Sequence, residues 1–242
     1  MGVIHTRRNL MFLLIIIGLS ALGSCSSSVD SEQRGEFLKR KTRVLLIGAS
    51  IGEAWNLKEL PLRLTDDKHV FESVAAWQYD KSEALEEVLM RPKRKFRFTK
   101  TYVKGFFQPP PQLPNIVILK ECASYFPGDQ HVYQEFIKKW VARIKQAQIQ
   151  VILATVVPVT RERASKRAGQ TEAIWQFNDW IRAYAKTEGL ILLDLESSLR
   201  QSPEHRYLRE DFTSGDGQHL NIKAYHILDR LLEEILEGNR NL

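Results

Sequence analysis

The stretch VLLIGASIGEAW, residues 44–55, contains the pattern that best indicates the fold class. Its first four residues form a short, continuously apolar run that Gly48 ends, and residues 51–64 then follow with helical spacing. A continuously apolar run of this length is typical of a strand that is buried on both faces. The sequence therefore predicts a buried strand that leads directly into a helix, which is the first unit of an α/β fold.

The same alternation of strand and helix continues along the chain. Further strands are predicted at residues 69–76, 115–119, 151–157 and 190–194. Further helices are predicted at residues 81–90, 132–146, 171–187 and 222–236. Because apolar strands that alternate with helices form parallel sheets covered on both faces, we predict a three-layer α/β/α fold with a parallel sheet of about five strands.

The composition narrows the class of protein. The chain has 242 residues, of which 43% are hydrophobic and 26% charged, and this excludes disorder, collagen and coiled coil as the main architecture. Its two cysteines, Cys25 and Cys122, are too few for a disulfide framework or a multi-cysteine zinc site, and no metal or cofactor is predicted. The formal net charge of +6 mildly favours anionic partners.

The N-terminus has the pattern of an export signal. Arg7 and Arg8 precede an apolar run at residues 10–19, which is shorter than the roughly 20 residues that a membrane span needs. The following Leu22-Gly23-Ser24-Cys25 resembles the lipobox of bacterial lipoproteins. This resemblance implies cleavage before Cys25 and a lipid on its thiol. The alternative is an uncleaved anchor helix with an incidental cysteine.

These signals divide the chain into three parts. Residues 1–24 are predicted to be a lipoprotein signal peptide, residues 25–41 a polar tether and residues 42–242 the folded domain. We expect the protein to be exported and anchored to the bacterial membrane by lipid. Because Ser26 is not the aspartate of retained lipoproteins, the outer membrane facing the periplasm is favoured if the host has two membranes.

A basic, proline-rich insertion at residues 91–114 interrupts the pattern. It contains seven lysines and arginines, the run Pro109-Pro110-Pro111 and interleaved aromatic residues. One interpretation is a lid or patch that meets an anionic polymer. The favoured interpretation is a hairpin at the edge of the sheet, whose lysines prevent that edge from pairing with another chain. Nucleic acid is not expected as a partner of an exported lipoprotein.

Ser50 is the first candidate for catalysis. It follows the predicted strand at the carboxyl end, where open parallel sheets bind ligands. Gly48 permits a sharp turn there, and the start of the helix favours developing negative charge. The alternative is that Ser50 only caps the helix.

A second candidate motif, Ser214-Gly-Asp-Gly-Gln-His-Leu-Asn221, lies before the last helix. Asp216 and His219 are three residues apart on one glycine-flanked loop, so the carboxylate can lie behind the imidazole. A serine nucleophile needs such a base, and the base needs such an orienting group. The alternative is a polar turn with an incidental His219, in which Asn221 caps the last helix.

Together these blocks resemble the SGNH (GDSL-like) hydrolase family over residues 42–236. The first block is Gly48-Ala49-Ser50 with Trp55, and the last is Asp216-x-x-His219-Leu220-Asn221 followed by Tyr225. The resemblance implies a flavodoxin-like fold. It also implies Ser50 as nucleophile, His219 as base and Asp216 as the orienting group.

The middle blocks depart from the family pattern. The family has Gly-x-Asn-Asp after the third strand, whereas this chain has Glu121-Cys-Ala-Ser-Tyr125. Alignment by strand places Ser124 at the position of the asparagine that donates to the oxyanion. A shift of the alignment by one residue places Ala123 at that position. Residues 75–78, Ala-Ala-Trp-Gln, stand where the family has a glycine amide. The expected oxyanion donors are therefore Ser50, Ala76 and Ser124, and losing one donor costs about 10²–10³ in rate.

Two residues near Ser124 raise separate questions. Glu121 would repel an oxyanion unless it pairs with Lys120 or points away. Cys122 is interpreted as a buried, inert thiol rather than as the nucleophile, because no histidine is assigned to it.

The leading functional hypothesis is a cell-envelope serine esterase that removes small acyl groups from a glycan. Its expected partners are an ester substrate, which an anionic acylated glycan would fit, and the membrane through the lipid on Cys25. One alternative is a non-catalytic envelope binding or assembly module on a degenerate scaffold. The other is an O-acyltransferase that uses the same serine.

Overall fold

A five-stranded sheet lies at the centre of the computed structural model, which describes residues 41–91 and 112–238. The strands are β1 (Thr42–Gly48), β2 (His69–Ala75), β3 (Ile116–Lys120), β4 (Gln150–Ala154) and β5 (Ile191–Leu193). Their order is β2-β1-β3-β4-β5, and every neighbouring pair is parallel. This is the flavodoxin-like strand order, so the predicted fold class is confirmed.

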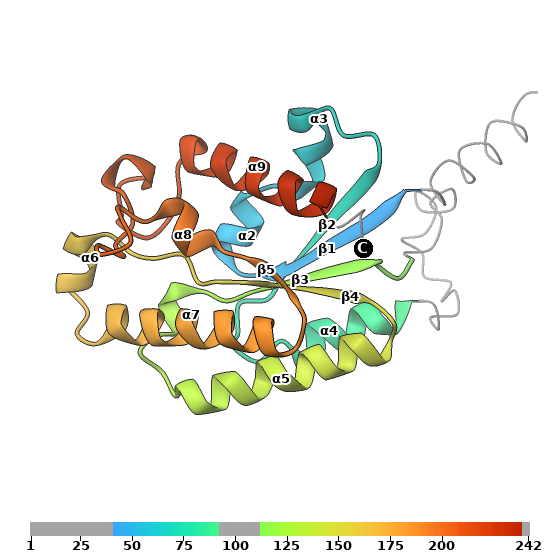
Figure 1. The fold of residues 1–242 in the computed structure, drawn as a ribbon, viewed down its shortest axis with the longest axis horizontal. Coiled ribbons are helices and arrows are strands. Elements are labelled where there is room, and N and C mark those ends of the chain that lie inside the picture. The colour runs from blue at the N-terminus through green and yellow to red at the C-terminus, as the bar shows by residue number, and fades with distance from the viewer. Residues whose placement is uncertain (1–40, 92–111, 239–242) are drawn as a thin grey trace, which may run out of the picture. The chain divides into compact units, whose positions relative to one another are not determined.

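Helices cover both faces of the sheet (Figure 1). One layer contains α4 (Ser82–Leu89), α5 (Gln130–Gln146) and α7 (Gln170–Thr187). The other contains α2 (Ser50–Ala54), α3 (Leu60–Leu64), α8 (Leu195–Leu199) and α9 (Ile222–Gly238). A short helix, α6 (Arg161–Ser165), and the 3-10 turns η1 (Leu57–Glu59), η4 (Ala123–Tyr125) and η5 (Glu210–Phe212) lie in the connections.

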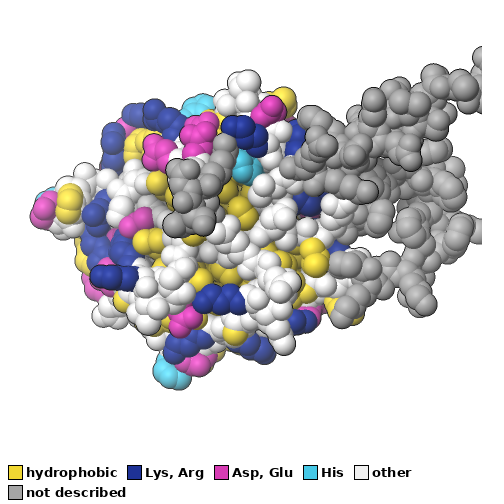
Figure 2. Space-filling view, turned by 45° about the vertical axis from the view of Figure 1, so that its right-hand side comes forward, with side chains coloured by type: hydrophobic (Ala, Val, Ile, Leu, Met, Phe, Trp, Pro, Cys, Tyr) yellow, Lys and Arg dark blue, Asp and Glu magenta, His cyan; other side chains and the backbone are white. Residues whose placement is uncertain are grey.

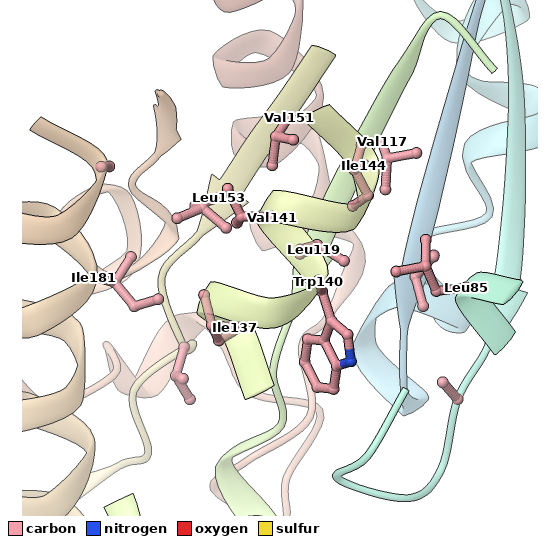
Figure 3. Packing of buried hydrophobic residues seen from close by; sticks show 14 of the residues in the cluster. Leu85, Val117, Leu119, Ile137, Trp140, Val141, Ile144, Val151, Leu153 and Ile181 are labelled. Carbon is pink, nitrogen blue, oxygen red and sulfur yellow. The ribbon is translucent and has the colours of Figure 1, made fainter. Parts of the chain in front are cut away.

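The pleat of the strands sorts their apolar side chains between the two layers. Leu45 and Ile47 of β1 belong to the core under α4, α5 and α7, whereas Val44 and Leu46 belong to the core under α2 and α9. This alternation is why β1 is apolar at each of residues 44–47. Figure 3 shows the first core, where Trp140 and its neighbours on α5 pack against β3 and β4.

Most predicted elements differ from the observed ones by one or two residues at an end, and two predictions differ by more. Residues 51–64 do not form one helix, because α2 ends at Ala54 and Asn56 takes a left-handed conformation with φ of 48° before η1 and α3 begin. The fourth strand ends at Ala154 rather than at residue 157. The Asn178 side chain bonds the amide and the carbonyl of Val156, at 2.7 and 2.9 Å, so this buried backbone needs no strand partner.

Several predictions concern residues outside the described part of the chain. The signal peptide, Cys25 and nearly all of the tether lie there, as do residues 92–111 of the basic insertion. Between residues 41 and 238, with the gap at 92–111, no helix is long and apolar enough to cross a membrane.

Candidate active site

Ser50 lies at the carboxyl end of β1, where it begins α2. The backbone of α2 lies very close to the strand, because a Cβ on Gly52 would stand 2.8 Å from Leu46 Cδ2. The far end of α2 is anchored by Trp55, whose indole Nε1 donates to Asp229 Oδ1 of α9 at 2.7 Å. A small residue and a buried indole thus fix the short helix that carries Ser50.

The loop before α9 brings Asp216 and His219 to the same edge. Gly215 and Gly217 flank Asp216 with φ of 114° and 76°, a region that favours glycine. Gly217 also has no room for a side chain, since a Cβ there would lie 2.5 Å from Thr160 Oγ1. As the sequence suggested, Asn221 caps α9: its Oδ1 accepts a hydrogen bond from the Ala224 amide at 3.2 Å.

Ser50, His219 and Asp216 form a continuous chain of hydrogen bonds. His219 Nε2 lies 3.1 Å from Ser50 Oγ, and His219 Nδ1 lies 2.5 Å from Asp216 Oδ2. The other carboxylate oxygen, Asp216 Oδ1, accepts the amides of Gln218 and His219 at 2.9 and 2.8 Å. The structure therefore brings together three groups that are separated by up to 169 residues in the chain.

The environment of Asp216 keeps it ionised. Partial burial would raise the pKa of Asp216, but hydrogen bonds from the His219 and Gln218 amides and from the His219 ring outweigh this and lower the pKa to about 2. A carboxylate in this position accepts the Nδ1 proton of His219. Nε2 then carries the lone pair and accepts the hydroxyl proton of Ser50.

The structure changes the expected set of oxyanion donors. The Ser50 amide, at the first turn of α2, has no hydrogen-bond acceptor among the described residues. The Ala76 amide is not available, because it donates to the Gly48 carbonyl at 2.7 Å and so extends the ladder between β2 and β1. The prediction that Ala76 supplies a donor is therefore wrong.

Ser124 lies in η4, which begins three residues after β3 ends. Its side chain is exposed, and its hydroxyl lies 3.1 Å from Cys122 Sγ. No hydrogen bond joins it to Ser50 or His219 in the described residues, so its role as an oxyanion donor stays a prediction. Cys122 itself is buried, and among the described residues its thiol has a hydrogen-bonding contact with Ser124 and none with a histidine.

Glu121 is paired, but its partner is not Lys120. The Lys81 ammonium donates to Glu121 Oε2 at 2.6 Å, and both side chains are almost completely buried. Burial raises the pKa of Glu121, although Lys81 opposes this shift. Lys120 instead donates to the Glu121 backbone carbonyl at 2.9 Å, and burial lowers the pKa of Lys120.

No pattern in the sequence predicts the roles of Lys81 and Tyr125. Lys81 was expected only as the start of a helix, and it lies 40 residues from its partner Glu121. The Tyr125 hydroxyl donates to the carbonyls of Ala76 and Gln78, at 3.3 and 3.2 Å. Because both links join distant loops, no local pattern in the sequence reveals them.

A metal centre is not built into this edge. Among residues 41–91 and 112–238, no group of three or more His, Cys, Asp and Glu side chains is arranged to hold a metal ion.

Comparisons with known proteins identify a related family and related folds. The sequence model described as the GDSL-like Lipase/Acylhydrolase family matches residues 110–227, which include Ser124, Asp216 and His219. Over these residues the chain is similar to this family. Ser50 lies outside the matched residues, and it is the structure that joins it to the other two members of the triad. No curated protein matches this chain.

Solved structures of several acylhydrolases share the fold at low sequence identity. A GDSL-like lipase from Bacteroides thetaiotaomicron has a TM-score of 0.59 and 17% identity, with 87% of this chain and 98% of that chain covered. A lipase/acylhydrolase from Enterococcus faecalis has a TM-score of 0.57 and 15% identity, with 82% and 96% covered. An acetyl xylan esterase has a TM-score of 0.53 and 16% identity, with 79% and 98% covered.

Proposed function

We propose that this GDSL-like acylhydrolase is a serine esterase that removes small acyl groups from a glycan of the cell envelope. The observation that carries the proposal is the chain of hydrogen bonds from Ser50 through His219 to Asp216. A hydroxyl, a histidine and an ionised carboxylate in this order are the parts that nucleophilic acyl transfer requires.

Each group then has a defined step. Ser50 Oγ attacks the ester carbonyl carbon while His219 Nε2 takes the hydroxyl proton. Asp216 stabilises the imidazolium that forms. When the tetrahedral intermediate collapses, His219 returns the proton to the alcohol that leaves. A water molecule, activated by the same histidine, then cleaves the acyl group from Ser50.

The exposure of the triad favours a small acyl group on a large substrate. The side chains of Asp216 and His219 are 48% and 41% exposed, so an ester on a polymer surface can reach them. A cavity of about 200 Å³ lies at the opposite edge of the sheet, near the start of β2 at His69, and none of the triad residues lines it. The exposed triad is accessible to an ester that is carried on a large substrate.

An exposed aromatic ring that follows β2, at the same edge of the sheet as Ser50, supports a carbohydrate as the other half of the ester. Trp77 is 62% exposed and follows Ala76, whose amide is bonded to Gly48, two residues before Ser50. A flat indole face is suited to stacking against the apolar face of a sugar ring. One solved structure of the same fold is that of an acetyl xylan esterase, whose name states that it acts on acetyl xylan.

The envelope location and the anionic character of the glycan rest on the sequence. On the face seen in Figure 2, lysines and arginines are interspersed with aspartates and glutamates, so the described surface there adds no support for an anionic substrate. The location depends on the lipobox-like segment 22–25. Cys25→Ala is expected to leave the precursor uncleaved and free of label from a palmitate analogue. Equal labelling of the variant would overturn the anchor.

Ester cleavage is the direct test. The full chain, solubilised in detergent, is assayed for release of p-nitrophenol from p-nitrophenyl acetate and of acetate from an O-acetylated glycan. We expect wild type to release both and Ser50→Ala to release neither. Acetate that appears on an added sugar hydroxyl instead of in water would indicate an O-acyltransferase.

The altered middle blocks favour a second candidate, a non-catalytic binding module. The Ala76 amide is committed to Gly48, and no asparagine follows β3. A folded wild type that binds O-acetylated glycan and releases nothing would support this alternative and overturn the esterase.

A further inference from the structure

The short helix α6 packs directly onto the loop that carries Asp216 and His219. The amide of Thr160, just before α6, donates to the Gly217 carbonyl at 2.9 Å. A Cβ added to Gly217 would lie 2.9 Å from Arg163 Cβ and 3.7 Å from Arg163 Cγ. The first carbons of the Arg163 side chain therefore lie against the triad loop, at the residue that follows Asp216.

The Arg163 side chain has no hydrogen-bond or ion-pair partner within residues 41–91 and 112–238. Its Nε is buried and lacks an acceptor, although the residue as a whole is only partly buried. The Asp216 carboxylate does not serve as a counter-ion, because it accepts its hydrogen bonds from Gln218 and His219. Native proteins leave few such donors unpaired, since each one costs free energy of desolvation. The triad loop is therefore flanked by a guanidinium group whose charge is not compensated.

Two other cations near the same loop are already engaged within the protein. Lys223, which follows the loop at the start of α9, forms an ion pair with Asp211. Arg161, on α6 itself, has its guanidinium carbon 5.1 Å from the centre of the Tyr207 ring. Arg163 differs from both, because it contacts the triad loop and its guanidinium remains available to a ligand.

We infer that Arg163 is a substrate-binding residue that holds a carboxylate of the glycan beside the triad. The inference rests on the proposed esterase function and deepens it, because it names the substrate class as an O-acylated polymer of a sugar acid. A guanidinium group binds a planar carboxylate through two parallel hydrogen bonds. Gly217, which Arg163 contacts, has its Cα at most about 7.6 Å from that of His219, because the two are two residues apart. The carboxylate is therefore expected on the sugar that carries the ester or on its neighbour.

Two acetylated glycans test the inference, one with carboxylates and one without. The full chain in detergent is assayed for release of acetate from O-acetylated polygalacturonate and from acetylated xylan. We expect wild type to have the higher kcat/KM on the acidic polymer. In Arg163→Gln the ratio of the two kcat/KM values is expected to fall about 10–100-fold, because hydrogen bonds to a charged group are lost. The loss is expected mainly in KM on the acidic polymer, since the contact forms in the ground state and the transition state alike.

Arg161→Gln is the matched control. It removes the same charge from the same short helix, at a residue that lies over the Tyr207 ring. Its ratio of kcat/KM values is expected to stay within about twofold of wild type. Arg163→Lys keeps the charge but loses the planar pair of donors, so an intermediate ratio is expected. Added salt is expected to lower kcat/KM on the acidic polymer more steeply in wild type than in Arg163→Gln.

The outcomes separate this inference from the esterase proposal. If Ser50→Ala is inactive but Arg163→Gln keeps the wild-type ratio, or wild type does not prefer the acidic polymer, the esterase stands and the inference fails. Equal losses on both polymers in Arg163→Gln also overturn it, because Arg163 would then only support the triad loop. Equal changes of the ratio in Arg161→Gln and Arg163→Gln overturn it too, since they indicate a general attraction to basic side chains. A folded wild type that releases acetate from neither polymer overturns both proposals.

Discussion

The loops that carry the triad differ from the loops after β2 and β3 in how their side chains are held. Asp216 and His219 are nearly half exposed and depend on hydrogen bonds within a glycine-rich turn. Lys81 and Glu121 are buried and hold their loops together by an ion pair. The reacting groups are therefore open to substrate, while the backbone around them is fixed from the interior of the protein.

The largest expected effect is on catalysis by the exposed triad. Ser50→Ala removes the nucleophile that His219 contacts at 3.1 Å. We expect kcat for p-nitrophenyl acetate to fall by about 10⁴-fold or more, because triad members act as a unit. Steady-state kinetics with unchanged far-UV circular dichroism check this. Retention of more than a tenth of the activity would place the nucleophile elsewhere.

The next effect is on the stability of the protein and concerns the buried ion pair of Lys81 and Glu121. Glu121→Ala leaves the Lys81 ammonium buried without its partner, and we expect the free energy of unfolding to fall by about 3–5 kcal/mol. Glu188→Ala is the control, since Glu188 pairs with Lys145 at 3.1 Å on the surface, and here we expect about 0–1 kcal/mol. Urea unfolding measures both.

A double variant sharpens this prediction. Replacing the whole pair in Lys81→Met/Glu121→Leu removes both buried charges, so most of the stability lost in Glu121→Ala is expected to return. The esterase kcat is not expected to return, because the two loops lose their fixed connection. Recovery of both quantities would show that the ion pair does not position the site.

Ser124→Ala tests a smaller contribution to kcat, from the loop after β3. If the Ser124 hydroxyl completes the oxyanion hole, kcat is expected to fall by about 10² with little change in KM. Ser124→Asn restores the side chain of the family pattern and is expected to retain more activity than Ser124→Ala. A kcat for Ser124→Ala within about twofold of wild type would exclude Ser124 as a donor.

The smallest expected effect is on how the stability contributed by Asp216 depends on pH. The pKa of Asp216 falls from its ordinary 3.8 to about 2 on folding, so its hydrogen bonds stabilise the folded state above pH 3.8. This contribution is lost as the pH falls through about 2. The difference in urea midpoint between wild type and Asp216→Asn is therefore expected to be constant above pH 5 and to shrink below 3.8. A constant difference down to pH 2 would contradict the lowered pKa.

The sequence was most informative where local patterns determine the structure. The apolar run at residues 44–47 predicts a buried strand because both faces of the sheet are covered, and glycines flank Asp216 because the turn needs positive φ. The predicted helix over residues 51–64 failed at Asn56, which turns the chain although neither glycine nor proline marks the position.

Long-range contacts explain the remaining errors. Whether the Ala76 amide is free depends on how far the β2–β1 ladder extends past Gly48, which is a property of two strands. The partner of Glu121 is Lys81, on another loop, whereas the neighbouring Lys120 binds a backbone carbonyl. Such contacts are set by packing, and the spacing of residue types within one segment does not reveal them.

The most direct test of the central claim is covalent labelling of the nucleophile. The full chain is treated with a fluorophosphonate, which reacts with activated serines, and the modified peptide is identified by mass spectrometry. We predict a single label on Ser50, which disappears in His219→Ala because the base is gone. A folded wild type that takes no label, or a label on Ser124 or another residue instead, would contradict the Ser50–His219–Asp216 triad.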